Sequence, residues 1–466
     1  MIARRSSSPT AVIAVTGAAL FMIVLDNLIV ASTLPTIGRD LHASLTELEW
    51  MVNAYILAFA VLMLTGAALG ERFGRRRMFV AGLSLFSLAS LAGGFAPSGS
   101  ALIAARVVQG AGAAVLMPLS LTLLSAAFPP ERRGTALGMW SAIAGLGVAL
   151  GPIAGGLLTT GLSWHWIFWV NVPVGFAAAA LAPRVLDESF GRREPVDVGG
   201  LALVSAALFA LVWSTVRGND VGWDAPVTLL GYAAAALLAT AFLGWERRRA
   251  HAMLPLRLFS SRVFSTVNVV GFLLHFAMFA AFFMVIQFLA HARGDGPITT
   301  GLWTLPWTVM PLVVSPFAAR LAQRIAPALL VTAGMALVGA GALGLSAVVG
   351  SGTHEASLAL PLWSIGVGVG LVLPNVVALA MGAVPAADLG KGSGTLNTAR
   401  QLGSVFGVAV AVAAYEAAGS SATPAATSAG AEAGFVVAGV AALLGAAAML
   451  TIAPRPSLAR LPVPAR

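Results

Sequence analysis

The stretch Gly138-Met-Trp-Ser-Ala-Ile-Ala-Gly-Leu-Gly-Val-Ala-Leu-Gly-Pro-Ile-Ala-Gly-Gly156 lies inside a long apolar segment and contains six glycines and one proline. Gly147, Gly151 and Gly155 recur every four residues, so on a helix they form one stripe without side chains, which lets a second backbone approach closely. Pro152 removes one backbone hydrogen bond and predicts a bend. Together these features favour a helix that rocks against its neighbour, although three glycines at this spacing are also typical of static close packing.

The composition is that of a polytopic membrane protein. Of the 466 residues, 58% are hydrophobic and only 10% are charged, whereas soluble domains have about 25% charged residues. The chain has no cysteine, which excludes a disulfide framework and thiolate chemistry. The sequence therefore predicts a fold made of membrane-spanning segments rather than several soluble domains.

Fourteen apolar runs are long enough to cross a bilayer, since a spanning helix needs about 20 mostly apolar residues. They lack the two-residue alternation of barrel strands, so we expect an all-α protein. The runs cover residues 11–33, 51–70, 78–96, 101–124, 135–158, 166–182, 199–216, 227–245, 265–290, 298–319, 328–349, 358–381, 397–418 and 433–452.

The net charge of +9 does not indicate nucleic-acid binding, because nearly all basic residues lie in short loops between the apolar runs. If the N-terminus is inside, 22 of the 27 Lys and Arg residues fall on the inner side, and such a bias sets the orientation of a membrane protein. We therefore predict both termini in the cytoplasm. The first apolar run carries Asp26 and is interpreted as a transmembrane helix rather than a cleaved signal.

The chain also contains an internal repeat. Residues 110–151 recur without a gap 256 positions later, where glycines and prolines coincide in eight pairs, from Gly110 with Gly366 to Gly151 with Gly407. We predict two copies of a six-helix bundle, residues 1–186 and 265–466, separated by a two-helix insertion over residues 187–264. Repeated halves around a midplane site are the architecture of alternating-access transporters. Arg106 and Gln109 have no polar counterpart in the second copy.

Asp26 is the one acid expected deep inside an apolar run. It lies roughly 10 Å from the outer end of the first helix, and Arg106 lies roughly 8 Å into the fourth helix. The two residues share a level and could meet if their helices are neighbours. An ionisable residue inside the membrane marks a functional site by default, although a static structural ion pair is the alternative.

Three motifs with independent spacing resemble one family. The Gly138–Gly156 stretch resembles the fifth-helix antiporter motif of the drug:proton antiporters of the major facilitator superfamily, and Gly138, Gly147, Gly151, Pro152, Gly155 and Gly156 occupy its positions. Leu25-Asp26-Asn27 resembles the first-helix signature of the fourteen-helix members. Arg106-x-x-Gln109-Gly110 is similar to the fourth-helix motif, whose arginine the resemblance implicates in proton transfer.

A further resemblance lies in the loop Leu69-Gly-Glu-Arg-Phe-Gly-Arg-Arg-Arg77, which is similar to the most general signature of the superfamily. Here Ala67 replaces its first glycine and Glu71 replaces its aspartate. The resemblance implies that Glu71, Arg72, Gly74, Arg75 and Arg76 form an inner gate that latches the two halves together. The plainer interpretation is a basic cluster on the cytoplasmic side, which explains the arginines but not Glu71 and Gly74.

Five further polar side chains in the runs are candidates for a substrate cavity, namely Asn53, Gln109, His275, Gln287 and Asn375. Taken singly, such residues more often make hydrogen bonds between helices. His275 and Glu416 are also candidates for a second titrating group. The sequence shows no metal-ligand spacing, no nucleophile elbow and no phosphate-binding loop, so we expect no metal, no catalytic residue and no direct use of ATP.

We therefore expect a fourteen-helix transporter in the bacterial cytoplasmic membrane, without a cofactor and with a proton as coupling ion. Its expected cargo is amphipathic drugs, dyes or antibiotics, since the runs are rich in aromatic residues and methionine and poor in fixed charge. A dedicated exporter of one endogenous metabolite is the close alternative, and a membrane sensor that does not transport is a more distant one. The expected partners are a small molecule and the lipid bilayer, with no nucleic acid and no second subunit.

Overall fold

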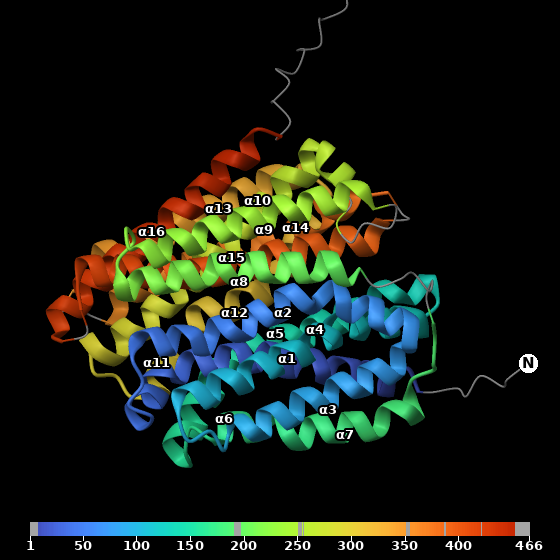
Figure 1. Ribbon diagram of the computed structural model, residues 1–466, viewed down its shortest axis with the longest axis horizontal. Coiled ribbons are helices and arrows are strands. Elements are labelled where there is room, and N and C mark those ends of the chain that lie inside the picture. The colour runs from blue at the N-terminus through green and yellow to red at the C-terminus, as the bar shows by residue number, and fades with distance from the viewer. Residues whose placement is uncertain are drawn as a thin grey trace, which may run out of the picture.

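The structure is a computed structural model that describes residues 8–190, 197–249, 254, 256–350, 355–385, 388–420 and 422–452. All regular elements within these residues are helices (Figure 1). The first part of the chain forms α1 (Pro9–Asp40), α2 (Leu45–Phe73), α3 (Arg75–Gly93), α4 (Gly99–Ala127), α5 (Pro130–Gly161), α6 (Trp166–Trp169) and α7 (Asn171–Val185). The middle part forms α8 (Val198–Val221), α9 (Pro226–Arg248) and the short η1 (Leu256–Ser260). The last part forms α10 (Arg262–Gln287), η2 (Phe288–Ala292), α11 (Pro297–Trp303), α12 (Leu305–Leu321), α13 (Pro327–Val348), α14 (Glu355–Gly382), α15 (Leu389–Ala418) and α16 (Pro424–Leu450).

Thirteen helices among the described residues are long and apolar enough to cross a membrane. Each of the fourteen apolar runs corresponds to one of these spans or to α3, a helix of 19 residues that begins with three arginines. The arginines lower the mean hydropathy of α3, yet it packs against α4 and α7 like the other helices of its bundle. The prediction of an all-helical polytopic fold is confirmed.

The two halves repeat one packing scheme. In the first half α1 packs on α5, α4 packs on α2 and α3, and α3 also packs on α7. In the second half α10 packs on α15, α14 packs on α12 and α13, and α13 also packs on α16. These matched pairs place α4 and α5 where the sequence repeat places α14 and α15.

The inserted helices α8 and α9 pack on each other, and α8 contacts α2 of the first half and α15 of the second. In Figure 1 both helices, drawn in green, cross the front of the molecule where the two halves meet. Large apolar side chains of α9 point outward, and Leu230 and Leu237 are 70% and 71% exposed. The division of the chain at residues 186/187 and 264/265 stays a prediction.

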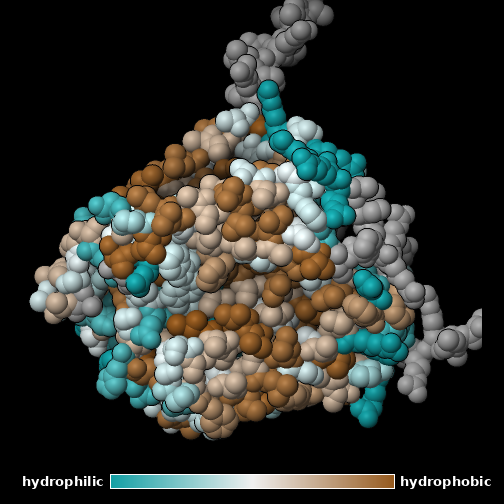
Figure 2. All heavy atoms as spheres, viewed as in Figure 1, coloured by the Kyte–Doolittle hydropathy of each residue, from teal (hydrophilic) through white to brown (hydrophobic). Residues whose placement is uncertain are grey.

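The outer surface has the zonation of a membrane protein. Figure 2 shows mainly hydrophobic residues across the middle of the visible face and hydrophilic residues gathered toward its two ends. The exposed Phe209 of α8 and the exposed leucines of α9 would be costly in water but are normal against lipid. We call the end at which α1 begins the near end, and the end at which α1 finishes and α11 begins the far end.

The two halves contact each other closely at the far end. α11 packs on α5 and α1, and α1 also contacts α10. Residues 29–35 of α1, in its far part, are all buried, whereas its near part alternates between buried and part-exposed residues. Halfway along the bundle, the Thr398 hydroxyl of α15 lies 3.4 Å from the carbonyl oxygen of Ala60 in α2.

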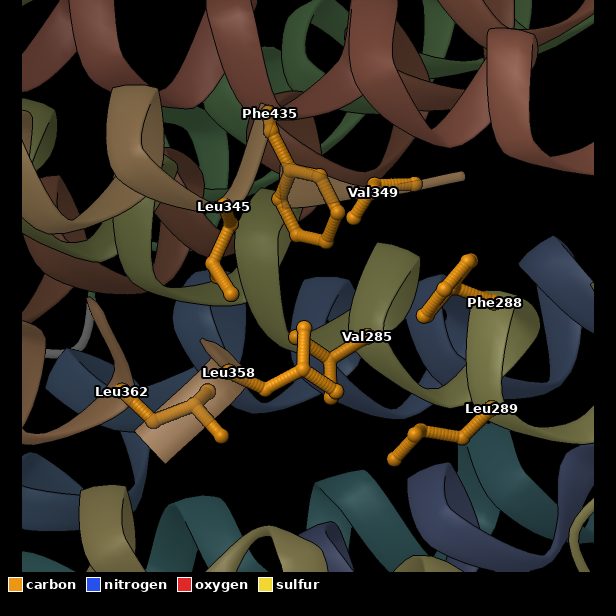
Figure 3. A pocket seen from close by; sticks show the side chains of 8 residues that line it. All are labelled: Val285, Phe288, Leu289, Leu345, Val349, Leu358, Leu362 and Phe435. Atoms are coloured by element: carbon orange, nitrogen blue, oxygen red, sulfur yellow. The ribbon is translucent and has the colours of Figure 1, made fainter. Parts of the chain in front are cut away.

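One small void lies inside the second half, between α10, η2, α13, α14 and α16 (Figure 3). Its volume is about 10 Å³, and its lining is apolar throughout, with Val285, Leu345 and Phe435 among the side chains. A space of this size holds at most one water molecule, which would find no polar partner there. The void is therefore a packing defect and offers no room for a substrate.

Candidate functional site

The structure brings Asp26 of α1 and Arg106 of α4 together as an ion pair between Asp26 Oδ2 and Arg106 Nη1. The side chains are 0% and 1% exposed. α1 and α4 are neighbours in the first half, so the shared depth of the two residues places them in contact. A carboxylate and a guanidinium that are both removed from solvent stabilise each other only with well-placed additional hydrogen bonds.

Neutral side chains supply those hydrogen bonds. Gln109 Nε2 donates to Asp26 Oδ1 over 2.7 Å, and Asn171 Nδ2 of α7 donates to the same oxygen over 3.0 Å. Both amides also donate to Ser90 Oγ of α3, over 3.0 and 3.1 Å. The carboxylate of Asp26 is therefore held by one cation and two amides from two helices, α4 and α7.

Arg106 has partners of its own besides Asp26. Its Nε donates to the carbonyl oxygen of Met51 over 3.1 Å, and its Nη1 donates to Gln109 Oε1 over 2.8 Å. The guanidinium carbon lies 4.1 Å from the centre of the Tyr55 ring, a cation–π contact. Its Nη2 is buried and makes no hydrogen bond within the described part of the chain. A buried donor without a hydrogen bond is energetically unfavourable, so the guanidinium would be stabilised in a conformation where Nη2 finds an acceptor.

The glycine stripe of α5 faces α1. A Cβ atom on Gly151 would lie 2.8 Å from Leu28 Cβ, and one on Gly155 would lie 2.6 Å from Ser32 Oγ. Gly147 is less constrained, because its Cβ would meet the carbonyl oxygen of Phe21 at 3.3 Å. The stripe thus lets α5 pack closely on α1, the helix that carries Asp26, within the same half.

Gly156 belongs to a different interface from the stripe. Its Cβ would lie 2.6 Å from the carbonyl oxygen of Pro297, the first residue of α11. One turn away, Gly301 of α11 packs against the carbonyl group of Pro152. The stretch that the sequence singled out therefore serves two contacts, one with α1 inside its half and one with the second half. Gly138 lies within α5.

The loop between α2 and α3 is fixed by the segment that follows α7. Gly74 has a φ of 106°, which favours glycine. The Glu188 carboxylate accepts hydrogen bonds from the backbone N–H groups of Arg76, over 2.9 Å, and Arg77, over 3.3 Å. A carboxylate at a helix N-terminus is stabilised by the unpaired N–H groups there. Glu188 thus ties this loop to its own half.

Glu71 makes one ion pair in the described structure, at 3.7 Å with Arg75 one turn later. Its side chain is 45% exposed. Arg72 is exposed and stacks on the neighbouring Phe73 ring, while Arg76 Nη1 donates to the carbonyl oxygen of Leu186 over 3.2 Å. In this conformation the expected gate residues contact their own half, and the latch between the halves stays a prediction.

The comparisons with known proteins agree on a family. The model of the Major Facilitator Superfamily matches residues 16–408. The chain belongs to this superfamily. The tetracenomycin C resistance and export protein of Streptomyces glaucescens is 36% identical over 84% of this chain and 73% of its own length. The multidrug resistance protein Stp of Mycobacterium tuberculosis is 37% identical over 85% of this chain and 74% of its own length.

Further proteins resemble the chain in sequence or in fold. The methylenomycin A resistance protein of Streptomyces coelicolor is 36% identical, over 83% of this chain and 82% of its own length. A crystal structure of a POT family transporter with a thioalcohol-conjugated peptide superposes with a TM-score of 0.71, covering 95% of each chain at 13% identity. That low identity supports the shared fold alone.

No hydrogen bond in the described part of the chain joins one of the residues expected in a substrate cavity of this major facilitator protein to another. Gln109 belongs to the Asp26 cluster and is 1% exposed, so it does not line an open cavity. Asn375 Nδ2 donates to the Leu371 carbonyl of its own helix over 2.8 Å, and Gln287 is buried with an unpartnered Oε1. His275 contacts Arg400 across α10 and α15.

Sequence reasoning missed two members of the cluster and one buried acid. Asn171 is the one amide in the run 166–182, a signal that could have identified it, whereas Ser90 gave none. Glu49 is 0% exposed and accepts a hydrogen bond from Asn53 Nδ2 over 3.4 Å. Glu49 lies outside the second apolar run, which begins at residue 51, but inside α2, which begins at Leu45. Asp26 is therefore not the only acid inside a span.

Proposed function

We propose that this transporter exports amphipathic drugs, dyes or antibiotics from the bacterial cell by exchanging them for protons across the cytoplasmic membrane. The observation that carries the proposal is the sealed Asp26–Arg106 pair with its two amide donors. The names of the relatives, which refer to resistance and export, support the direction and the class of cargo.

Coupling requires that Asp26 binds a proton in one conformation and releases it in another. A carboxylate that faces a guanidinium and two amide N–H groups is stabilised in its charged form. If α1 and α4 move apart, Asp26 loses these partners in a poorly hydrated place and takes up a proton. Arg106 can then keep its hydrogen bond to the Met51 carbonyl oxygen and turn its unpaired Nη2 toward a new acceptor in place of the lost carboxylate. The cluster is thus a proton site whose affinity depends on the packing of α1 against α4.

The predicted orientation places the near end in the cytoplasm. The far end, where Gly156 meets Pro297, is then the outer side, and the described conformation is closed to the outside. Exchange requires this contact to open while the near end closes, which is the alternating access of repeated halves. In the closed near end Glu71 would meet the second half and serve as a latch. The expected cargo reaches a midplane site between the halves, and the protein acts as a monomer with no cofactor and no nucleic-acid partner.

A dedicated exporter of a single antibiotic is the second candidate, because several relatives are named for one compound each. One experiment separates the possibilities. Inverted membrane vesicles containing the protein are incubated with a panel of fluorescent dyes and antibiotics, with and without an imposed pH gradient, and uptake into the vesicles is measured. Uptake of many compounds that needs the gradient supports a multidrug antiporter, uptake of one supports a dedicated exporter, and gradient-independent uptake contradicts proton coupling.

A further inference from the structure

A second cation inside a membrane span, Arg400, lies in α15 about 16 Å from the start of that helix. None of the described residues of α15 from Lys391 to Tyr415 is exposed, and α2, α8, α10, α14 and α16 all pack on this helix. Arg400 is therefore directed into the protein rather than toward lipid. By the sequence repeat its counterpart in the first half is Ala144, so the charge is specific to the second half.

The partners of Arg400 are neutral. Its Nε donates to His275 Nε2 of α10 over 3.1 Å, and its Nη1 lies 3.4 Å from Asn397 Oδ1. His275 Nδ1 lies 3.0 Å from the carbonyl oxygen of Gly271, so Nδ1 carries the proton and Nε2 accepts from the guanidinium. Both ring nitrogens are thus engaged, and a proton on Nε2 would break the contact with Arg400. This arrangement argues against His275 as a second carrier of the coupling proton.

The contrast with Arg106 is informative. Arg106 is sealed and faces a carboxylate, whereas Arg400 is part-exposed and has no acidic side chain within ion-pair distance among the described residues. Its Nη2 makes no hydrogen bond in that part of the chain and is not sealed from solvent. One edge of the guanidinium therefore points into accessible space at the level of the bilayer.

A cation inside a membrane span is costly unless it is compensated, and a neutral side chain could make the two hydrogen bonds to His275 and Asn397. We propose that Arg400 binds an anionic group, a carboxylate or an ionised phenol, of the transported molecule, with His275 and Asn397 positioning the guanidinium. This inference rests on the proposed export function for the identity of the ligand, but the binding itself needs no gradient and no proton transfer.

The test compares rhodamine B, which carries a free carboxylate, with its ethyl ester. Each dye is titrated with the purified full-length protein in lipid nanodiscs, and binding is measured by fluorescence anisotropy. We expect the free acid to bind about tenfold more tightly than the ester, as for one charge-assisted hydrogen bond. Equal affinities, or no binding of the acid, would overturn the proposal.

The variants make this test specific. Arg400→Gln should abolish the preference for the free acid while leaving the affinity for the ester unchanged, which also shows that the protein is folded. Arg400→Lys should keep part of the preference, because it keeps the charge but not the planar fork. Arg249→Gln, which removes an exposed arginine at the end of α9, is the matched control and should bind like the wild type. A preference that survives in Arg400→Gln refutes the assignment.

An inorganic anion is the other possible source of negative charge. If Arg400 takes only chloride, replacing chloride by gluconate lowers the unfolding temperature of the wild type but not of Arg400→Gln, and the two dyes bind equally, which overturns the proposal. Failure of the export function has a different signature, because vesicle uptake is lost while the preference for the free acid remains.

Discussion

Asp26 and Arg106 form an ion pair whose two members come from α1 and α4 of the same half, and none of the described residues of the second half takes part in it. The pair is closed to solvent, and α1, the helix that carries Asp26, packs along the glycine stripe of α5. A proton can therefore reach Asp26 only after the packing within this half has changed. The proposed coupling therefore depends on how movement between the halves is transmitted to α1.

Asp26→Asn keeps the shape of the side chain and its hydrogen bonds to Gln109 and Asn171, but it cannot take up a proton. We expect dye uptake driven by a pH gradient in inverted vesicles to fall by more than about tenfold, since a loss of 1.4 kcal/mol of coupling corresponds to a factor of ten. Dye binding and downhill exchange should remain. Glu432→Gln, at an exposed acid of α16, serves as the control. Uphill uptake by Asp26→Asn would mean that another group carries the proton.

Gly151→Leu tests the contact between α5 and α1. A Cβ atom at this position would already lie 2.8 Å from Leu28 Cβ, and a larger side chain must separate the two helices. We expect an inserted, folded protein that transports at less than about a tenth of the wild-type rate, as overpacking costs 1–3 kcal/mol. Gly161→Leu is the control in the same helix, because nothing lies within 4 Å of a Cβ there. Equal transport at equal membrane abundance contradicts the close contact.

Gly156→Ala tests the contact between the halves. The added methyl group would lie 2.6 Å from the Pro297 carbonyl oxygen, so the far end should open more often. The chain contains no cysteine, which permits labelling of a single cysteine introduced at Thr300, a residue of α11 that is 2% exposed. We expect about tenfold faster labelling than with Gly161→Ala, for a penalty of about 1.4 kcal/mol. Identical labelling rates would show that α5 and α11 do not control access.

Glu71→Ala tests the latch. In the described conformation Glu71 pairs only with Arg75 of its own loop, so its removal should leave this state intact and destabilise the state with a closed near end. A single exposed ion pair contributes about 0.2–1 kcal/mol, so labelling of a cysteine at Thr122 in α4 should rise about two- to fivefold at most. Arg72→Ala, at an exposed side chain without an ion pair in the described structure, should change labelling less. Reduced transport with unchanged labelling would exclude a latch.

The sequence alone predicted the membrane-spanning helices, because the length and hydropathy of each run depend only on local composition. It also predicted the repeat, whose matched glycines and prolines reflect a backbone packing that both halves share. Asp26 and Arg106 could be placed at one level, since the rise of a helix per residue is constant. These properties follow from the chain in order, without knowledge of which helices are neighbours.

Only the tertiary structure decided which partners the polar residues have. Asn171 and Ser90 complete the Asp26 cluster because α3 lies beside α4 and α7 lies beside α1 and α3, and no local pattern encodes that adjacency. The glycine-rich stretch Gly138–Gly156 was recognised in sequence, but the division of its glycines between α1 and α11 depends on the faces that α5 turns to each half. Among the described residues Arg400 has no acidic partner for the same reason, since the charge balance of a residue inside the bundle is set by side chains distant in sequence that folding brings within a few ångströms of it.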